Sequence, residues 1–333
     1  PLPDSVLKKH SHTLSVSQIS IDHAGEFVGS CSGVDGRVII TGLYTLENNH
    51  NFQPFNDGRP IYSISLDPLY SKNHSGRRFM TGDERVYLHE KTSLINFNRY
   101  KQIALSGPGD GPITRIKWRG RFAAWCGRRG VVVYDIITME QISIIKYEVH
   151  LPTSQEIAVD KRTEGEFVTR LAWSDQYTLY MSQGDNVKIC KIKKRSDPIE
   201  ILRQRDLPGH LVEIVSAFKL EDSWVCGIAP MDDRLIVILA MPKDDPTRVE
   251  MLVVEALEDD FNYISTDVLA IDGEETTDLE DVGSANDRKP NSPHDYDLEC
   301  LLADKQYYVI SPNELVMGKP CDMDDHIDWL LDH

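Results

Sequence analysis

The hydrophobic pattern of the chain is built from a short block of strands separated by turns. The block is clearest at residues 113–136, where ITRIKW, RFAAWC and VVVYDI each have the length and composition of a strand. Arg119-Gly120 and the segment 127–130 supply the turns between them. No stretch between these strands is long enough for a helix, so the pattern predicts an all-β fold.

The block recurs along the chain. Copies begin at Val16, Ile61, Ile113, Val168 and Ile214, which gives steps of 45, 52, 55 and 46 residues. Each copy has an apolar-x-x-apolar-x-apolar strand, a strand of small and apolar residues, and an alternating strand. A period in this range with about four strands per copy is typical of β-propeller blades.

Weaker strand patterns continue the repeat at Val249–Glu255, Tyr263–Ile271 and Leu298–Ser311. With the five clear copies they predict a WD40-like β-propeller of six or seven blades. One blade is expected to be incomplete, because the chain starts at Pro1 without a Met. The Gly-His and Trp-Asp dipeptides of WD repeats are absent, so this prediction depends on period and strand pattern.

Two segments depart from the propeller pattern, which is predicted for residues 1–320. Residues 272–297 are rich in Asp, Glu, Gly, Ser and Pro and are predicted to be a mobile acidic insertion, because they cannot bury enough apolar surface to offset the entropy cost of ordering. Residues 321–333 are predicted to begin a helix of a further domain. Asp324 or Asp325 can cap it, and its apolar positions have helical spacing: Ile327, Leu330 and Leu331.

Trp118 and Trp173 occupy the same place in their copies, at the end of the first strand. Core packing between neighbouring blades is the simplest role for an aromatic residue there, ahead of ligand stacking. Asp35-Gly36 and Asp185-Asn186 are predicted to form turns between strands.

The charge balance excludes some classes of partner. With 36 Lys and Arg against 53 Asp and Glu, the formal net charge is −17. This argues against a dedicated nucleic-acid-binding protein and against a surface that lies wholly on anionic lipid. Two sets of basic residues are predicted to be solvated edges, with an anionic partner or a lipid headgroup as the alternative. They are Lys188, Lys191, Lys193, Lys194 and Arg195, and the turn residues Arg119, Arg121, Arg128 and Arg129.

The cysteines are predicted to be buried thiols in a reducing compartment rather than disulfides or zinc ligands, because none are closely spaced and no C-x-x-C occurs. They are Cys31, Cys126, Cys190, Cys226, Cys300 and Cys321.

No catalytic, cofactor-binding or metal-binding residue is predicted. The chain has no H-E-x-x-H or G-x-S-x-G motif. His89-Glu90 and Asp22-His23 are isolated and are expected in turns or at the surface. The segment SGPGDG at 106–111 lacks the Lys-Ser/Thr of a phosphate-binding loop and is expected to be a turn.

Several segments resemble the vacuolar protein sorting-associated protein 41 family, a subunit of the HOPS complex. They are QISIDHAGEFVGSCSGVDGRVIITGLY, RIKWRGRFAAWCGRRGVVVYDI, LPGHLVEIVSAF and DDHIDWLL, and the resemblance covers residues 16–333. It implies an N-terminal propeller followed by an α-solenoid, so that 321–333 would begin the solenoid.

The resemblance also implies a function. The domain would be a non-enzymatic interaction module of a complex that tethers late endosomes, lysosomes or vacuoles before fusion. Implied partners are other HOPS subunits and a membrane-bound small GTPase of the Rab or Arf-like class, with peripheral membrane contact. The family also acts in the adaptor complex three pathway and in regulated secretion. The resemblance assigns no partner-binding residues.

Two other functions stay open at this stage. A vesicle-coat scaffold shares the propeller-plus-solenoid layout, and some propellers are hydrolases. A further hypothesis is that phosphorylation in or near the acidic segment regulates membrane association, at Ser265, Thr276, Thr277, Ser284 and Ser292.

Overall fold

The computed structural model describes most of the repeated region and leaves gaps between its segments. The described residues are 12, 15–44, 50–55, 57–92, 100–148, 168–196, 207–232, 234–269, 271, 291–301, 305–312 and 314–320. The strands among them fall into two compact units, one around β1–β12 and one around β13–β23, with the end of β15 and the start of β16 assigned to the first.

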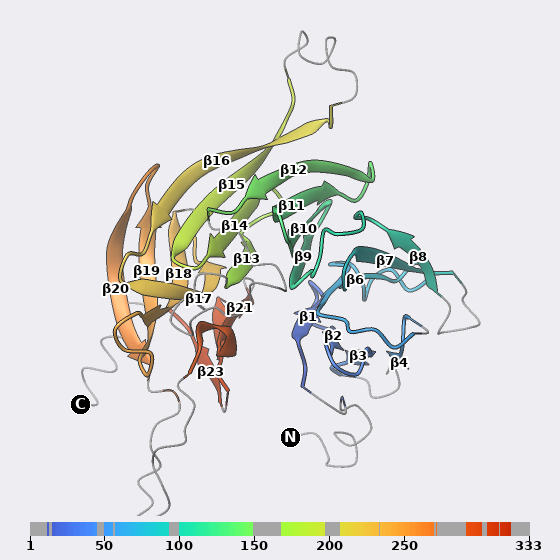
Figure 1. The fold of residues 1–333 in the computed structure, drawn as a ribbon, viewed down its shortest axis with the longest axis horizontal. Helices are drawn as coiled ribbons and strands as arrows, with labels where there is room; N and C mark the ends of the chain where they lie inside the picture. Colours follow the sequence, from blue (N-terminus) through green and yellow to red (C-terminus); the bar gives the residue numbers. More distant parts are fainter. Residues whose placement is uncertain are drawn as a thin grey trace, which may run out of the picture. The chain divides into compact units, whose positions relative to one another are not determined.

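The first unit contains three antiparallel sheets whose strands follow chain order (Figure 1). The first sheet is β1 (Gln18–Ile21), β2 (Phe27–Cys31), β3 (Val38–Gly42) and β4 (His50–Phe52). The second is β5 (Ser63–Leu66), β6 (Arg78–Gly82), β7 (Val86–Lys91) and β8 (Tyr100–Ala104). The third is β9 (Arg115–Arg119), β10 (Phe122–Gly127), β11 (Gly130–Asp135) and β12 (Glu140–Lys146).

The second unit contains three more sheets of the same design. One is β13 (Thr169–Trp173), β14 (Thr178–Gln183), β15 (Asn186–Lys194) and β16 (His210–Lys219). The next is β17 (Ser223–Pro230), β18 (Leu235–Pro242), β19 (Val249–Ala256) and β20 (Phe261–Leu269). The last is β21 (Asp297–Leu301), β22 (Gln306–Ile310) and β23 (Leu315–Gly318), preceded by the 3-10 turn η2 (Pro293–Asp295).

Burial within each sheet explains why some strands are continuously apolar and others are polar. All six residues of β10 and all six of β11 are buried, because these middle strands are covered on both faces. In contrast, β8 and β20 end their sheets and are largely exposed. The polar sequence YKQIA forms β8, although nothing in its pattern predicts a strand.

The hydrophobic core lies between neighbouring sheets of each unit. In the first unit, side chains of β6 and β7 pack against β9, β10 and β11, with Trp118 and Trp125 among them. In the second, Phe218 and Tyr180 pack against β17–β19, and Tyr296, Leu298 and Tyr307 pack against the other face of that sheet. Both predicted core tryptophans, Trp118 and Trp173, are buried.

Serine hydroxyls on the first strand of one sheet bond to the backbone of the next sheet in the first unit. Ser20 Oγ accepts a hydrogen bond from Leu66 N at 3.0 Å, and Ser65 Oγ accepts one from Trp118 N at 3.1 Å. The hydroxyl of Ser63 donates to Ile113 O at 2.8 Å. These bonds satisfy backbone groups that no sheet ladder reaches.

One longer polar side chain in each unit reaches across three sheets. Gln18 on β1 accepts from Ile64 N at 3.3 Å and donates to Ile116 O at 3.1 Å. Arg170 on β13 donates to Cys226 O at 2.6 Å and to Tyr296 O at 2.7 Å. Both side chains are buried, so each unit has its own polar clasp between the first, second and third sheets.

Close approach of two sheets requires glycine at one position of β17. A Cβ on Gly227 would overlap the Leu298 side chain and lie 2.8 Å from Leu298 N. This fits the predicted strand of small and apolar residues in each copy.

The described residues form six sheets, the lower of the two predicted blade counts. Residues 291–297, counted within the acidic insertion by sequence, are placed: Ser292 and Asp295 form a capping box around η2, and Tyr296 is buried. The rest of that insertion, 272–290, and the predicted helix at 321–333 lie outside the described residues.

Candidate functional site

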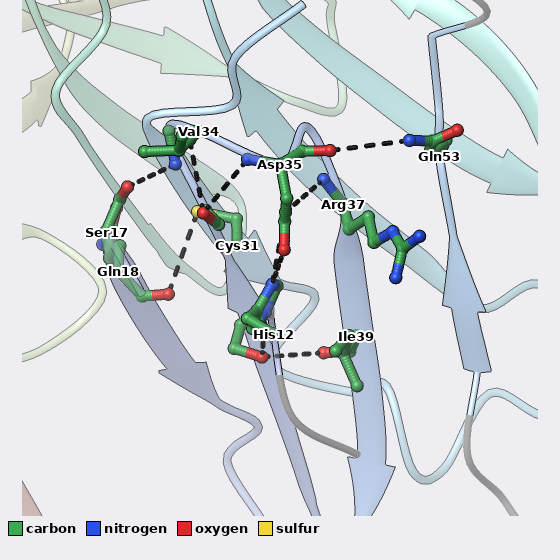
Figure 2. A network of polar contacts seen from close by, with 12 residues as sticks. His12, Ser17, Gln18, Cys31, Val34, Asp35, Arg37, Ile39 and Gln53 are labelled. Atoms are coloured by element: carbon green, nitrogen blue, oxygen red, sulfur yellow. Dashed lines mark hydrogen bonds and ion pairs between the residues drawn. The ribbon is translucent and has the colours of Figure 1, made fainter. Parts of the chain in front are cut away.

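A carboxylate, an imidazole and a hydroxyl meet on the first sheet (Figure 2). Asp35 lies in the turn after β2, Ser30 lies within β2, and His12 precedes β1. The distance from His12 Nδ1 to Asp35 Oδ2 is 3.1 Å, and that from His12 Nε2 to Ser30 Oγ is 3.0 Å. The side chains of His12 and Asp35 are 3% and 6% exposed. Sequence analysis missed this group because His12 lies before the first repeat.

Local turn chemistry positions Asp35. Ser32 Oγ accepts from Asp35 N at 3.3 Å, and Asp35 Oδ1 accepts from Arg37 N at 2.9 Å. Gly36 has φ +63°, and a Cβ there would lie 2.6 Å from Arg59 O. The predicted Asp35-Gly36 turn is therefore confirmed.

The order Asp35–His12–Ser30 matches the roles of a serine hydrolase triad, but its surroundings do not support acyl transfer. Ser30 lies in a middle strand, paired with Ile19 on one side and Ile39 on the other. Its hydroxyl also donates to Ile39 O at 3.4 Å. The ladder uses the nearby backbone N–H groups, which an oxyanion hole would need to be free. The network therefore attaches His12 to the first sheet.

A second charged group surrounds Asp135 at the end of β11. Arg121 donates to both carboxylate oxygens, at 2.9 and 2.8 Å, in a bidentate pair. Burial raises the pKa of Asp135, but the hydrogen bonds from Arg121 and from the backbone of Ile137 and Thr138 outweigh it, so the pKa is lowered. His210 Nδ1 lies 3.6 Å from Asp135 Oδ2.

The predicted solvated arginine edge is therefore only partly correct. Arg121 is committed to buried Asp135, and Arg129 Nη2 lies 2.7 Å from Asp110. Arg128 Nε donates to Gly111 O at 3.2 Å. These contacts tie the turn at 127–130 to the loop 106–111, which is a turn as predicted.

The basic run on β15 shows more of the predicted solvation. Lys191, Lys193 and Lys194 are exposed, and Lys193 pairs with Glu213. The turn before β15 differs by one residue from the prediction: β14 ends at Gln183, and Gly184 takes the positive φ of +60°.

His89 is the clearest error among the isolated polar pairs. It was expected in a turn or at the surface, but it lies on β7 with 2% exposure. Its ring stacks on Phe79 at 4.6 Å between centroids, and Nε2 lies 2.7 Å from Thr81 Oγ1. Burial lowers the pKa of His89 to about 3, so the ring is neutral.

Asp22 and His23 were expected in a turn or at the surface, and each meets one of these expectations. Asp22 is buried in its turn, where Oδ1 accepts from Glu26 N at 2.8 Å and from Phe27 N at 2.9 Å. His23 is exposed at the surface.

Cys31, Cys126, Cys190 and Cys226 are buried thiols as predicted, whereas Cys300 is only half-buried. No disulfide joins the cysteines of the described residues, and burial raises the pKa of Cys31, Cys190 and Cys226 to about 12. Such thiols are poor nucleophiles. Cys321 lies outside the described residues.

Across the described residues, no group of three or more His, Cys, Asp and Glu side chains could hold a metal ion. No helix within those same ranges is long and apolar enough to span a membrane.

In the described residues, five sheets of four antiparallel strands and one of three, all in chain order and with their cores between neighbours, define a β-propeller. A solved β-propeller domain, that of Myceliophteria_thermophila Cps50 (Swd1), matches with a TM-score of 0.59 at 12% identity, over 93% of this chain and 84% of that one. The β-propeller model of the Vps41 family, described as "Vps42 beta-propeller", matches residues 3–319. The chain belongs to this family of vacuolar sorting proteins, which is not a family of enzymes.

Relatives in animals and plants carry the same family name. Vacuolar protein sorting-associated protein 41 homologs are 35% identical in Danio rerio and 32% in Homo sapiens, each over 96% of this chain. The Arabidopsis thaliana homolog is 30% identical over the full chain. In each case the chain spans 34% of the relative's length.

Proposed function

We propose that this β-propeller is the interaction domain of a HOPS-type tethering subunit, which docks vesicles and endosomes on lysosomes or vacuoles before fusion. The observation that carries the proposal is the family match over residues 3–319. A propeller in which the polar groups around His12, Asp135 and Arg170 are engaged in structural bonds is suited to presenting loops and edges to partners.

The proposed partners are the other subunits of the complex and a membrane-bound small GTPase of the Rab or Arf-like class, with adaptor complex three as a further partner. The GTPase would bring the chain to late endosomal, lysosomal or vacuolar membranes as a peripheral protein. The net charge of −17 favours recruitment through a protein over direct adsorption to anionic lipid.

A pull-down of the 333-residue chain against Rab and Arf-like proteins tests the proposal. Each GTPase is presented loaded with a non-hydrolysable GTP analogue or with GDP. Capture of one GTPase in its GTP form alone is the expected result. Capture that ignores the nucleotide, or no capture across the panel, would contradict GTPase binding by this domain.

A further inference from the structure

The outer strand β20 leaves one side of its backbone uncovered. It pairs with β19 alone, at the end of the order β17-β18-β19-β20 (Figure 1). Residues 262–268 are all exposed. Tyr263, Ile264 and Val268 are 60%, 55% and 58% exposed. An edge of this kind presents alternate N–H and C=O groups to solvent.

The strand also has few of the features that normally prevent edge pairing. It is nine residues long, whereas the outer strands β4 and β23 have three and four. Residues 261–269 contain no Lys, Arg or Pro. The one irregularity, between Val253 and Val254, falls opposite Ile264 and leaves 265–269 in regular register. A long, exposed and partly apolar edge indicates a binding site.

The register assigns the side chains of β20 to two faces. Tyr263 is paired with Val254 and Val268 with Glu250, so these two apolar side chains lie on one face of the strand, whereas Ile264 falls in the bulge. Asp267 is paired with Met251 and lies on the opposite face. A strand added beside β20 would therefore meet apolar groups on one face and a carboxylate on the other.

Carboxylates surround this edge without matching cations. Asp222 and Asp267 have no ion pair within the described chain. The pKa of Tyr263 is raised by burial and then by the charges of Asp222 and Glu250. The nearby cations are already paired: Arg248 with Glu250 at 2.5 Å, and Lys219 and Lys243 with Asp185 at 3.5 and 2.6 Å. The edge is thus electronegative.

We propose that the β20 edge, defined by Tyr263, Ile264, Asp267 and Val268, binds an extended segment of a partner protein by strand addition. The segment carries apolar side chains on one face and Lys or Arg on the other. The acidic residues 272–290 of this chain have the wrong charge to occupy the edge. A second copy would set the carboxylates of Asp267 and its neighbours against each other. The proposal is independent of the vacuolar role.

A synthetic nonapeptide of alternating Lys and Val with a central Thr serves as the probe, and a peptide of the same composition in block order is its control. Hydrogen exchange of the 333-residue chain is measured with and without each peptide. We expect slower exchange in β20 with the alternating peptide only. Equal protection by the block peptide, or no protection at saturation, overturns the proposal.

Side-chain variants test the two faces separately by fluorescence anisotropy of the labelled probe. Val268→Lys and Asp267→Lys should each weaken binding about fivefold. Met317→Lys, on an equally exposed outer strand (59%), is the matched control and should bind as the parent does. An alternating Glu and Val peptide should gain affinity for Asp267→Lys. Equal losses in all three variants would overturn the assignment to β20.

Backbone pairing has its own signature. Successive N–H groups of a strand point in opposite directions, so N-methylation of alternate probe residues blocks either the side that pairs or the side that faces solvent. One methylated series should lose binding and the other should keep it. Equal behaviour of the two series would exclude strand addition. A sedimenting dimer of the parent chain that Val268→Lys dissociates would instead identify a second copy as the occupant.

Discussion

At the scale of single residues, buried polar groups decide how stability responds to pH and to substitution. His89 and Arg170 are both buried, and they behave oppositely. The imidazole of His89 is held neutral against Phe79. The guanidinium of Arg170, a group that is always charged in proteins, donates to backbone carbonyls of Cys226, Pro293 and Tyr296 and lies 3.6 Å from Asp297 Oδ1. Each therefore makes a distinct prediction.

Replacement of His89 by Gln should flatten the acid side of the stability profile. Burial lowers the pKa of His89 to about 3 from the ordinary histidine value of 6.5, so below pH 6.5 the unfolded chain binds a proton that the folded chain excludes. Stability from this group is complete above 6.5 and falls with pH down to 3. Between pH 7 and 5 the parent should lose about 2 kcal/mol more than the variant.

Urea unfolding at each pH measures this difference. His89→Phe, which also cannot titrate, should flatten the profile by the same amount although its stability at neutral pH differs. Parallel profiles for the parent and both variants would show that His89 becomes protonated in the folded state.

Replacement of Arg170 by Met should lower the free energy of unfolding by about 3 kcal/mol or more, because four backbone carbonyls lose their buried donor and Asp297 loses its cation. Arg248→Met is the control: its pair with Glu250 is 48% exposed on the arginine side, and its loss should cost less than about 1 kcal/mol. Thermal melting of the parent chain and the two variants measures these losses of stability. Similar losses for Arg170→Met and Arg248→Met would contradict the role of Arg170 in joining the three sheets.

At the scale of strands and sheets, the contact between β17 and β21 depends on the missing side chain at Gly227. A Cβ there would meet the backbone nitrogen of Leu298 at 2.8 Å, and neither backbone can move far within its sheet. The same substitution at Gly318, on β23, meets nothing within 4 Å. The two glycines therefore form a matched pair for testing how tightly these sheets approach each other.

Gly227→Ala should cost about 3 kcal/mol and should speed hydrogen exchange in β21 and β22 more than in β2 and β6. Gly318→Ala should leave both quantities close to the parent values. Exchange that rises evenly across all sheets, or a cost similar to that of Gly318→Ala, would mean that the two sheets adjust freely to an added methyl group.

Sequence patterns predicted the middle strands better than the outer strands, for a physical reason. Two outer strands depart from this: Tyr263–Ile271 was predicted and overlaps β20, and Ile214, taken as the start of a copy, lies on the outer strand β16. Strands covered on both faces, such as β10 and β11, are continuously apolar and stand out. The outer strand β8 carries one solvated face and reads as a loop. The His12 network and the clasp of Arg170 join residues far apart in the chain, so no local pattern could reveal them.

At the scale of the whole chain, electrostatics sets which surfaces it approaches. A net charge of −17 repels anionic membranes and nucleic acid over roughly one Debye length, about 8 Å at physiological salt. Membrane recruitment should therefore need a protein already bound there, and this can be tested without knowing its identity.

The chain alone should not sediment with vesicles rich in phosphatidylserine at about 0.15 M salt. Vesicles that display the GTPase identified by the pull-down, in its GTP form, should bring the 333-residue chain into the pellet. Sedimentation with bare anionic vesicles, reversed by higher salt, would instead assign direct lipid binding to a local basic surface.

The two polar clasps, at Gln18 and Arg170, also constrain how the number of repeats can change over evolutionary time. Gln18 reaches from the first sheet to the third, and Arg170 does the same among the last three. Each of these side chains therefore joins a set of three sheets, a triplet. Duplicating or deleting one repeat within a triplet would leave a buried amide or guanidinium without its hydrogen-bond partners. Repeat gain or loss is therefore expected between triplets, and each set of three should be inherited as a block.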